Sequence, residues 1–316
     1  MSSIEIRRDD LVIVSRGASN DATRGLAKTE IHQRAKPTLL AATVFGVLVS
    51  FSGLTLWFLF HAFVLTPIQE HGSQARLYAD FREQLANATA PLGGVIKPGS
   101  PVALLDGHIQ GLRDLVVVEG TTSKQLTLGP GHLRDTPLPG QQGVSVLFGR
   151  SVTFGAPFRA MTRLKAGDAI TVTTAQGVFT FRVDRIRLPG DPLPPSFPAN
   201  EAHMTLVTSA ASGWRSGWAP AHSIYLDATL VGAKAVPAPP GRPTGVSKAS
   251  LAMRGDTGLL ILLLLWLGPL LLVSVGLSLA WKRWGRGQTW LVGLPIALAI
   301  LWGASGAIMQ HLPNLI

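Results

Sequence analysis

Three long stretches of this chain carry no formally charged residue, and they constrain the fold more than any other feature of the sequence. They are residues 38–66, 257–281 and 289–316, while all 28 Lys and Arg and all 18 Asp and Glu lie elsewhere. A bilayer core of about 30 Å needs about 20 consecutive apolar residues in a helix. We therefore expect three transmembrane helices, over residues 38–66, 257–281 and 289–312.

The first of these stretches differs from a secretory signal peptide. It is longer than the apolar region of about 7–15 residues that such peptides contain, and no small-residue cleavage site follows it. We interpret it as an uncleaved membrane anchor.

Basic residues predict how these helices are oriented. The loop over residues 282–288 joins the second and third stretches and contains Lys282, Arg283 and Arg286 but no acidic residue. Short loops rich in Lys and Arg stay on the cytoplasmic side of a membrane. The sequence thus predicts a multi-pass protein of the plasma membrane, with a cytoplasmic N-terminus and with residues 67–256 outside the cell.

The segments outside the membrane differ in pattern. Residues 1–37 mix charged and small residues without an apolar period, which is typical of a disordered tail. Residues 67–99 favour a juxtamembrane helix, with Ser73 as its expected N-cap, followed by a linker. Residues 233–256 are Pro-rich and predict a stiff linker back to the membrane.

Residues 100–232 contain many short β-like runs separated by Gly and Pro, which favour a closed β-barrel. The clearest is residues 170–183, two alternating runs around Ala175, Gln176 and Gly177, which predict a hairpin. The expected fold is therefore mainly β, a closed barrel outside the cell held by three transmembrane α-helices.

Several kinds of chemistry are excluded by composition. The chain has no Cys, so it has no disulfide, no zinc-thiolate site and no cysteine nucleophile. Its eight His show no metal-ligand spacing, so we expect no metal and no cofactor. No helix-turn-helix or RNA-binding signature is present, and an external domain would not meet nucleic acid.

Five runs in the predicted barrel carry a resemblance to a known family: PVALLDGHIQGL, VVVEGTTSKQLTLGPGHLRDTPLPGQQG, TFGAPF, LKAGDAITVTTAQGVFTFRV and MTLVTS. Their order and spacing resemble the sortases, most closely the class E sortases of actinobacteria. The resemblance implies a sortase-like β-barrel. It also implies a transpeptidase that cleaves a sorting signal on a secreted protein and joins that protein to an amine of the cell envelope.

The residues that this chemistry needs are replaced here. A sortase uses a Cys nucleophile, a His that protonates the leaving amine, and an Arg that stabilises the oxyanion. At the matching positions this chain has Ser209 for the Cys, Arg150 for the His and Ser223 for the Arg. With a shift of one residue, His222 would take the place of the Arg.

Two functions follow from these replacements. An alcohol needs an adjacent general base, and Arg150 cannot accept a proton. We therefore expect a catalytically inactive scaffold, accessory subunit or peptide-binding component of a cell-envelope complex. The alternative is an active acyltransferase or hydrolase that uses Ser209 with His222 as a substitute base. A third hypothesis, a signalling subunit, finds no supporting motif in the N-terminal tail.

Other residues are candidates for binding. Trp214, Arg215 and Trp218 lie in the loop after Ser209, and with Tyr225 they are candidate contacts for a peptide in the groove. Ordinary loop packing would equally explain the loop residues.

Partners are expected among other envelope or membrane proteins, through the transmembrane helices. Ala299, Gly303 and Gly306 form a small-residue face in the third stretch that permits close helix packing. The helix packed there is either the second stretch or a separate membrane partner. His132, within the GPGH run, is expected to make a hydrogen bond that stabilises a turn.

Overall fold

The structure is a computed structural model that describes residues 39–109, 111–194, 196–210, 222–255 and 260–316. The predicted tail over residues 1–37 lies outside this range. Contacts divide the chain into two units, residues 1–49 and 50–316, and the strands all belong to the second.

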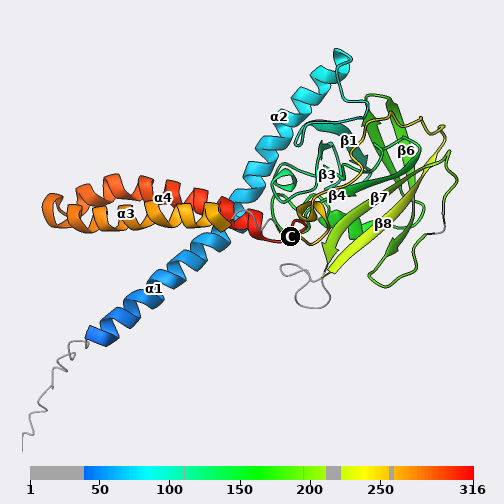
Figure 1. Cartoon of the computed structure of the whole chain (residues 1–316). Coiled ribbons are helices and arrows are strands. Elements are labelled where there is room, and N and C mark those ends of the chain that lie inside the picture. Colours follow the sequence, from blue (N-terminus) through cyan, green and yellow to red (C-terminus); the bar gives the residue numbers. More distant parts are fainter. Residues whose placement is uncertain (1–38, 110, 195, 211–221, 256–259) are drawn as a thin grey trace, which may run out of the picture. The chain divides into compact units, whose positions relative to one another are not determined.

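The strands close into the barrel that the sequence predicts (Figure 1). Their order around it is β1-β2-β3-β4-β7-β8-β6-β5, with β2–β3 and β4–β7 parallel and the other neighbours antiparallel. The strands are β1 (Pro101–Gly107), β2 (Leu115–Glu119), β3 (Gly131–His132), β4 (Gly143–Phe148), β5 (Ala169–Thr174), β6 (Gly177–Arg187), β7 (Ala202–Ala210) and β8 (His222–Val231).

The hairpin predicted over residues 170–183 is confirmed. Strands β5 and β6 pair antiparallel up to Thr174 and Gly177, so a two-residue turn joins them. Gly177 has φ +139°, which a residue without Cβ adopts at low cost. Alternate residues of β5 point into the barrel, and Ile170 and Val172 are fully buried there.

The barrel has apolar clusters on both faces of its wall at β4, β7 and β8. The interior core takes Leu147, Leu206 and Leu226 from these strands. Their neighbours point outward, because side chains alternate along a strand. The second cluster is formed by buried Leu126, Phe148, Val207 and Leu315, with Leu133, Val146, Tyr225, Ala252 and Met253 at its margin. A segment far away in sequence therefore covers this part of the outer face.

The helical part before the barrel is longer than predicted. Helix α1 (Leu39–Phe60) continues through a π-helical turn, η1 (His61–Leu65), into α2 (Thr66–Ala86). The expectation that Ser73 caps a helix is wrong, because its hydroxyl donates to the Gln69 carbonyl inside α2. All of η1 and the first seven residues of α2 precede Ser73, so the helix starts earlier than its polar residues suggest.

Helix α2 is attached to the barrel by Gln74. Its side-chain amide donates to the carbonyls of Val116 and Leu128 and accepts from the Val116 N–H. Phe81 of the same helix is almost fully buried.

Helices α3 (Leu260–Trp284) and α4 (Arg286–His311) run side by side as a hairpin (Figure 1). Two glycines of α4 allow the close approach: a Cβ on Gly293 would clash with Leu277, and one on Gly303 would clash with Trp266. Short helical turns among the described residues are η1, η2 (Gln125–Thr127), η3 (Arg159–Arg163) and η5 (Lys248–Ser250).

Two helical stretches of the described chain are long and apolar enough to span a membrane, Leu48–Ala86 and Gly287–His311. Within α3, the described apolar stretch Gly268–Ala280 is shorter. Two candidate spans thus agree with a membrane-anchored protein, and the third remains a prediction.

The Pro-rich linker lies on the barrel before it reaches α3. Gln141 and Val236 form a parallel bridge, and Pro239 packs on Gly93.

Candidate functional site

The three residues predicted to stand at the sortase catalytic positions lie on, or directly after, neighbouring strands. Arg150 follows β4, which pairs in parallel with β7 so that Phe148 lies opposite Val207. Ser209 is near the end of β7, and the β7–β8 register places Ser223 directly opposite it. Residues opposite each other on antiparallel strands share one face. Ser209 and Ser223 therefore lie on the outer face, beside the second apolar cluster.

The Ser209 hydroxyl is buried and held by two oxygen partners. It donates to the main-chain oxygen of Leu315 at 2.7 Å and lies 2.7 Å from the Ser151 hydroxyl. Neither partner is a base. Since this hydroxyl is directed at a carbonyl oxygen, it serves in this arrangement as a hydrogen-bond donor.

His222 is the substitute base suggested by the sequence, and it lies opposite Ala210, one position beyond Ser209. Successive residues of a strand point to opposite faces. Ala210 packs against the interior core. The register thus directs His222 away from the face that carries Ser209.

Arg150 is fully buried beside this serine pair. Its guanidinium donates to four oxygens: the carbonyls of Leu126 (3.2 Å) and Ser123 (3.1 Å), the Thr153 hydroxyl (3.2 Å), and the Ile316 main-chain oxygen (2.6 Å). It also lies 4.9 Å from the centre of the Phe154 ring. Burial lowers the pKa of Arg150 to about 9, so the group remains a cation at neutral pH.

The backbone after Arg150 is unusual. Phe154, Gly155 and Ala156 all have positive φ, and the Phe154 N–H donates to the Thr66 hydroxyl of α2. Buried Glu70 of α2 lies at the same turn, because a Cβ on Gly155 would meet its carboxylate. Burial raises the pKa of Glu70 to about 7, and the neighbouring His71 opposes that shift.

Both Ser209 and Arg150 thus contact residues 312–316, which follow α4 and are called here the post-α4 segment. Sequence reasoning did not identify this segment, nor Ser151 and Thr153, as part of the site. Its one sequence signal is Pro313 and Asn314 directly after an apolar helix, which marks a helix end but not a destination.

Four other residues are predicted to contact a peptide. Of these, Trp214, Arg215 and Trp218 lie outside the described residues. Tyr225 is on the outer face at the margin of the second cluster, with its hydroxyl 3.2 Å from that of Ser223 and its ring against Arg187.

On α4, only part of the predicted small-residue face packs against α3. Gly303 packs on Trp266 of α3, whereas Ala299 is exposed and a Cβ on Gly306 would meet nothing within 4 Å. Within the described part of the chain, no group of three His, Asp or Glu side chains is placed to hold a metal.

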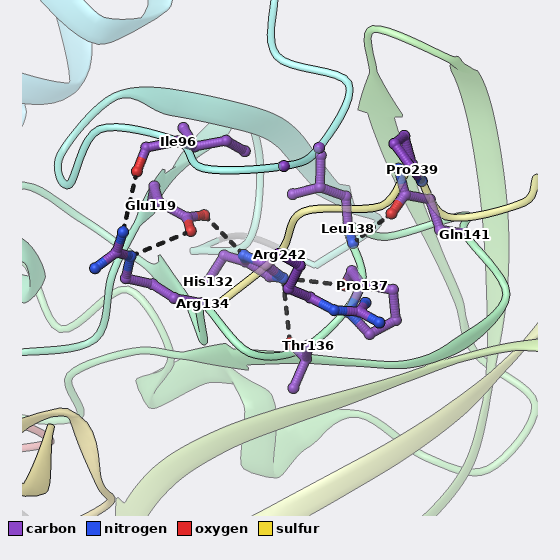
Figure 2. Close-up of a pocket in the computed structure, with 12 residues that line it drawn as sticks. Ile96, Glu119, His132, Arg134, Thr136, Pro137, Leu138, Gln141, Pro239 and Arg242 are labelled. Carbon is purple, nitrogen blue, oxygen red and sulfur yellow. Dashed lines mark hydrogen bonds and ion pairs between the residues drawn. The ribbon is translucent and has the colours of Figure 1, made fainter. Parts of the chain in front are cut away.

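A second polar cluster surrounds His132 (Figure 2). Its Nδ1 lies 2.8 Å from the Glu119 carboxylate, and its Nε2 lies 3.0 Å from the Pro137 carbonyl and 3.2 Å from the Thr136 hydroxyl. The expected turn-stabilising role of His132 is confirmed. The adjoining cavity, of about 10 Å³, has room for one water-sized molecule.

Comparison with known proteins finds similarity to sortases in the part of the chain that forms the barrel. A sortase-domain family model matches residues 108–213, which include Arg150 and Ser209. This region is sortase-like. Sortase D of Bacillus subtilis (strain 168) is 32% identical over 75 residues, which are 24% of this chain and 36% of that protein. The chain thus matches only about a third of the length of this curated relative.

Solved sortase structures are similar at lower identity. A sortase D5 transpeptidase of Clostridium perfringens is 23% identical with a TM-score of 0.42, covering 51% of this chain and 99% of that one. A sortase E variant of Streptomyces avermitilis is 24% identical with a TM-score of 0.34, covering 49% and 100%.

Proposed function

We propose that this chain is a catalytically inactive, class E-like sortase homologue that binds rather than cleaves. It would act as a scaffold, accessory subunit or peptide-binding component of a cell-envelope complex. The observation that carries the proposal is the environment of Ser209, whose hydroxyl contacts Ser151 and a main-chain oxygen and has no base beside it in the described chain. Arg150 takes the position of the family's proton donor, and as a buried cation it cannot activate a hydroxyl.

The location proposed is the plasma membrane, with three spans, a cytoplasmic N-terminus and residues 67–256 outside the cell. Large apolar side chains are exposed along α1, α3 and α4, among them Phe45, Leu272 and Leu291 at 69%, 71% and 79%. Exposed apolar surface of this extent favours a lipid environment. The post-α4 segment contacts the barrel, which supports placing the end of the third span on the same side as residues 67–256.

A serine-reactive fluorophosphonate tests inactivity. We expect the full-length protein in mild detergent to remain unlabelled at Ser209, because an unactivated alcohol reacts slowly. Ser209→Ala is the matched control. Labelling that maps to Ser209 and disappears in this variant would favour the alternative, an active serine acyltransferase or hydrolase.

The scaffold role is tested by native mass spectrometry of the full-length protein extracted from its own membranes. A stoichiometric assembly with another membrane or envelope protein supports it. A protomer without a protein partner that carries a peptide-sized adduct on Ser209 contradicts it.

A further inference from the structure

The post-α4 segment makes specific hydrogen bonds along its whole length. The Leu315 oxygen accepts from the Ser151 N–H at 3.0 Å as well as from Ser209, and the Ile316 oxygen accepts from the Thr153 hydroxyl at 2.6 Å as well as from Arg150. At the other end, the Leu312 oxygen accepts from the Ser123 hydroxyl at 2.9 Å. The barrel therefore binds this segment through its main chain, as a peptide groove binds a ligand.

Two side chains of the segment add sequence specificity. Asn314 is fully buried, and its amide nitrogen donates to the carbonyls of Thr121 (2.7 Å) and Leu251 (3.0 Å). Leu315 is fully buried between Leu126, Phe148 and Val207. A buried, hydrogen-bonded Asn followed by a buried Leu lets the barrel distinguish this segment from other sequences at two side chains.

When the segment leaves, hydrogen-bond donors and apolar side chains of the groove lose their partners. Arg150 loses one of its four acceptors, the donors on Ser151 and Ser209 lose the Leu315 oxygen, and the apolar cluster loses its central Leu. A buried cation and a hydrophobic pocket that open together need an occupant that offers carbonyl oxygens and an aliphatic side chain.

We propose that residues 312–316 are a built-in peptide ligand of the groove at Arg150 and Ser209, held there in cis by α4. The groove is closed to other peptides until this segment is displaced, and it then takes a peptide of the same chemistry, an Asn followed by aliphatic residues. The inference rests on the proposed function, a groove that binds without catalysis, and it names the ligand of that groove.

The absence of Cys provides a direct test, because single reporter cysteines can be introduced. In full-length protein in mild detergent, the rate of maleimide labelling of Ser209→Cys is measured with and without Leu315→Asp. Reporters at buried Val172 (Val172→Cys) and exposed Thr89 (Thr89→Cys) monitor unfolding and intrinsic reactivity. Leu193→Asp is the matched control, because Leu193 is 80% exposed.

We expect Leu315→Asp to accelerate labelling of the Ser209→Cys reporter by about tenfold or more, because several hydrogen bonds and a buried Leu no longer close the groove. Leu193→Asp should leave the rate unchanged. A synthetic peptide of sequence His-Leu-Pro-Asn-Leu-Ile added in excess should slow the reaction again, and the same peptide with Asp in place of the second Leu should not.

Equal rates with and without Leu315→Asp would overturn the proposal, as would an accelerated reaction that the synthetic peptide does not slow. If the Val172→Cys reporter shows that Leu315→Asp unfolds the barrel, the milder Asn314→Ala decides by the same two criteria. If the protein is active, contrary to the proposed function, the fluorophosphonate labels native Ser209. That result is separate from the maleimide rates.

Discussion

Arg150 is a buried guanidinium that donates hydrogen bonds to four oxygens, which belong to Ser123, Leu126, Thr153 and Ile316. Replacing it by Ala removes these bonds and leaves a cavity, so we expect Arg150→Ala to lower the free energy of unfolding by about 3 kcal/mol or more. Arg150→Lys should recover little, because an ammonium cannot reach the same spread of acceptors. Thermal unfolding of the full-length protein measures both.

Arg113→Ala is the control for these variants, because Arg113 is an exposed Arg of the same barrel and should cost less than about 0.5 kcal/mol. Equal losses for Arg113→Ala and Arg150→Ala would show that the buried network does not stabilise the fold.

Glu70 predicts a pH dependence of stability. Its pKa is raised from 4.5 to about 7 by burial, so the folded state binds a proton more tightly than the unfolded chain. Its contribution is therefore most favourable below pH 4.5 and is lost as the pH rises from 4.5 to about 7, by about 3 kcal/mol at most. Melting temperatures of the parent and of Glu70→Gln between pH 4.5 and 8 test this.

The Glu70→Gln variant should be the more stable protein at pH 8, and the difference should shrink toward pH 4.5, because Gln carries no charge at either pH. A constant difference across this range would contradict the assignment to Glu70.

At the scale of elements, two glycines of α4 offer a matched pair. A side chain on Gly303 meets Trp266, whereas one on Gly306 meets open space. We expect Gly303→Leu to separate α3 from α4 and lower the melting temperature in detergent, while Gly306→Leu leaves it nearly unchanged.

If Gly306→Leu nevertheless abolishes a native assembly without lowering stability, this glycine contacts a separate membrane protein. Equal loss of stability in the two variants would contradict the α3–α4 packing described above.

At the scale of the whole molecule, topology is the property to test. Single cysteines at exposed Thr89 and Gln288 lie in segments that we propose to be outside and inside the cell. A membrane-impermeant maleimide should label Thr89→Cys in intact cells, and Gln288→Cys only after the membrane is permeabilised. The parent chain, which has no Cys, is the blank. Labelling of both variants in intact cells would refute the proposed orientation.

Much of the fold could be predicted from sequence because its signals are local. The β5–β6 hairpin follows from strict alternation around a Gly, and the barrel begins at Pro101 and ends at Val231, close to the change in pattern at residues 100 and 232. The start of helix α2 differs from the prediction, because Ser73 resembles an N-cap in the sequence but lies inside a helix that continues from η1.

For the site, the sequence by itself determined that the chain has no Cys, and it predicts that Arg150, Ser209 and Ser223 stand where a sortase has its His, Cys and Arg. Only the tertiary structure decided what surrounds them. The register of β7 and β8 separates His222 from Ser209, and the closed barrel brings residues 312–316 onto side chains more than a hundred positions earlier. Composition and periodicity report on neighbours along the chain, whereas this contact exists only after the barrel has closed and α4 has returned to it.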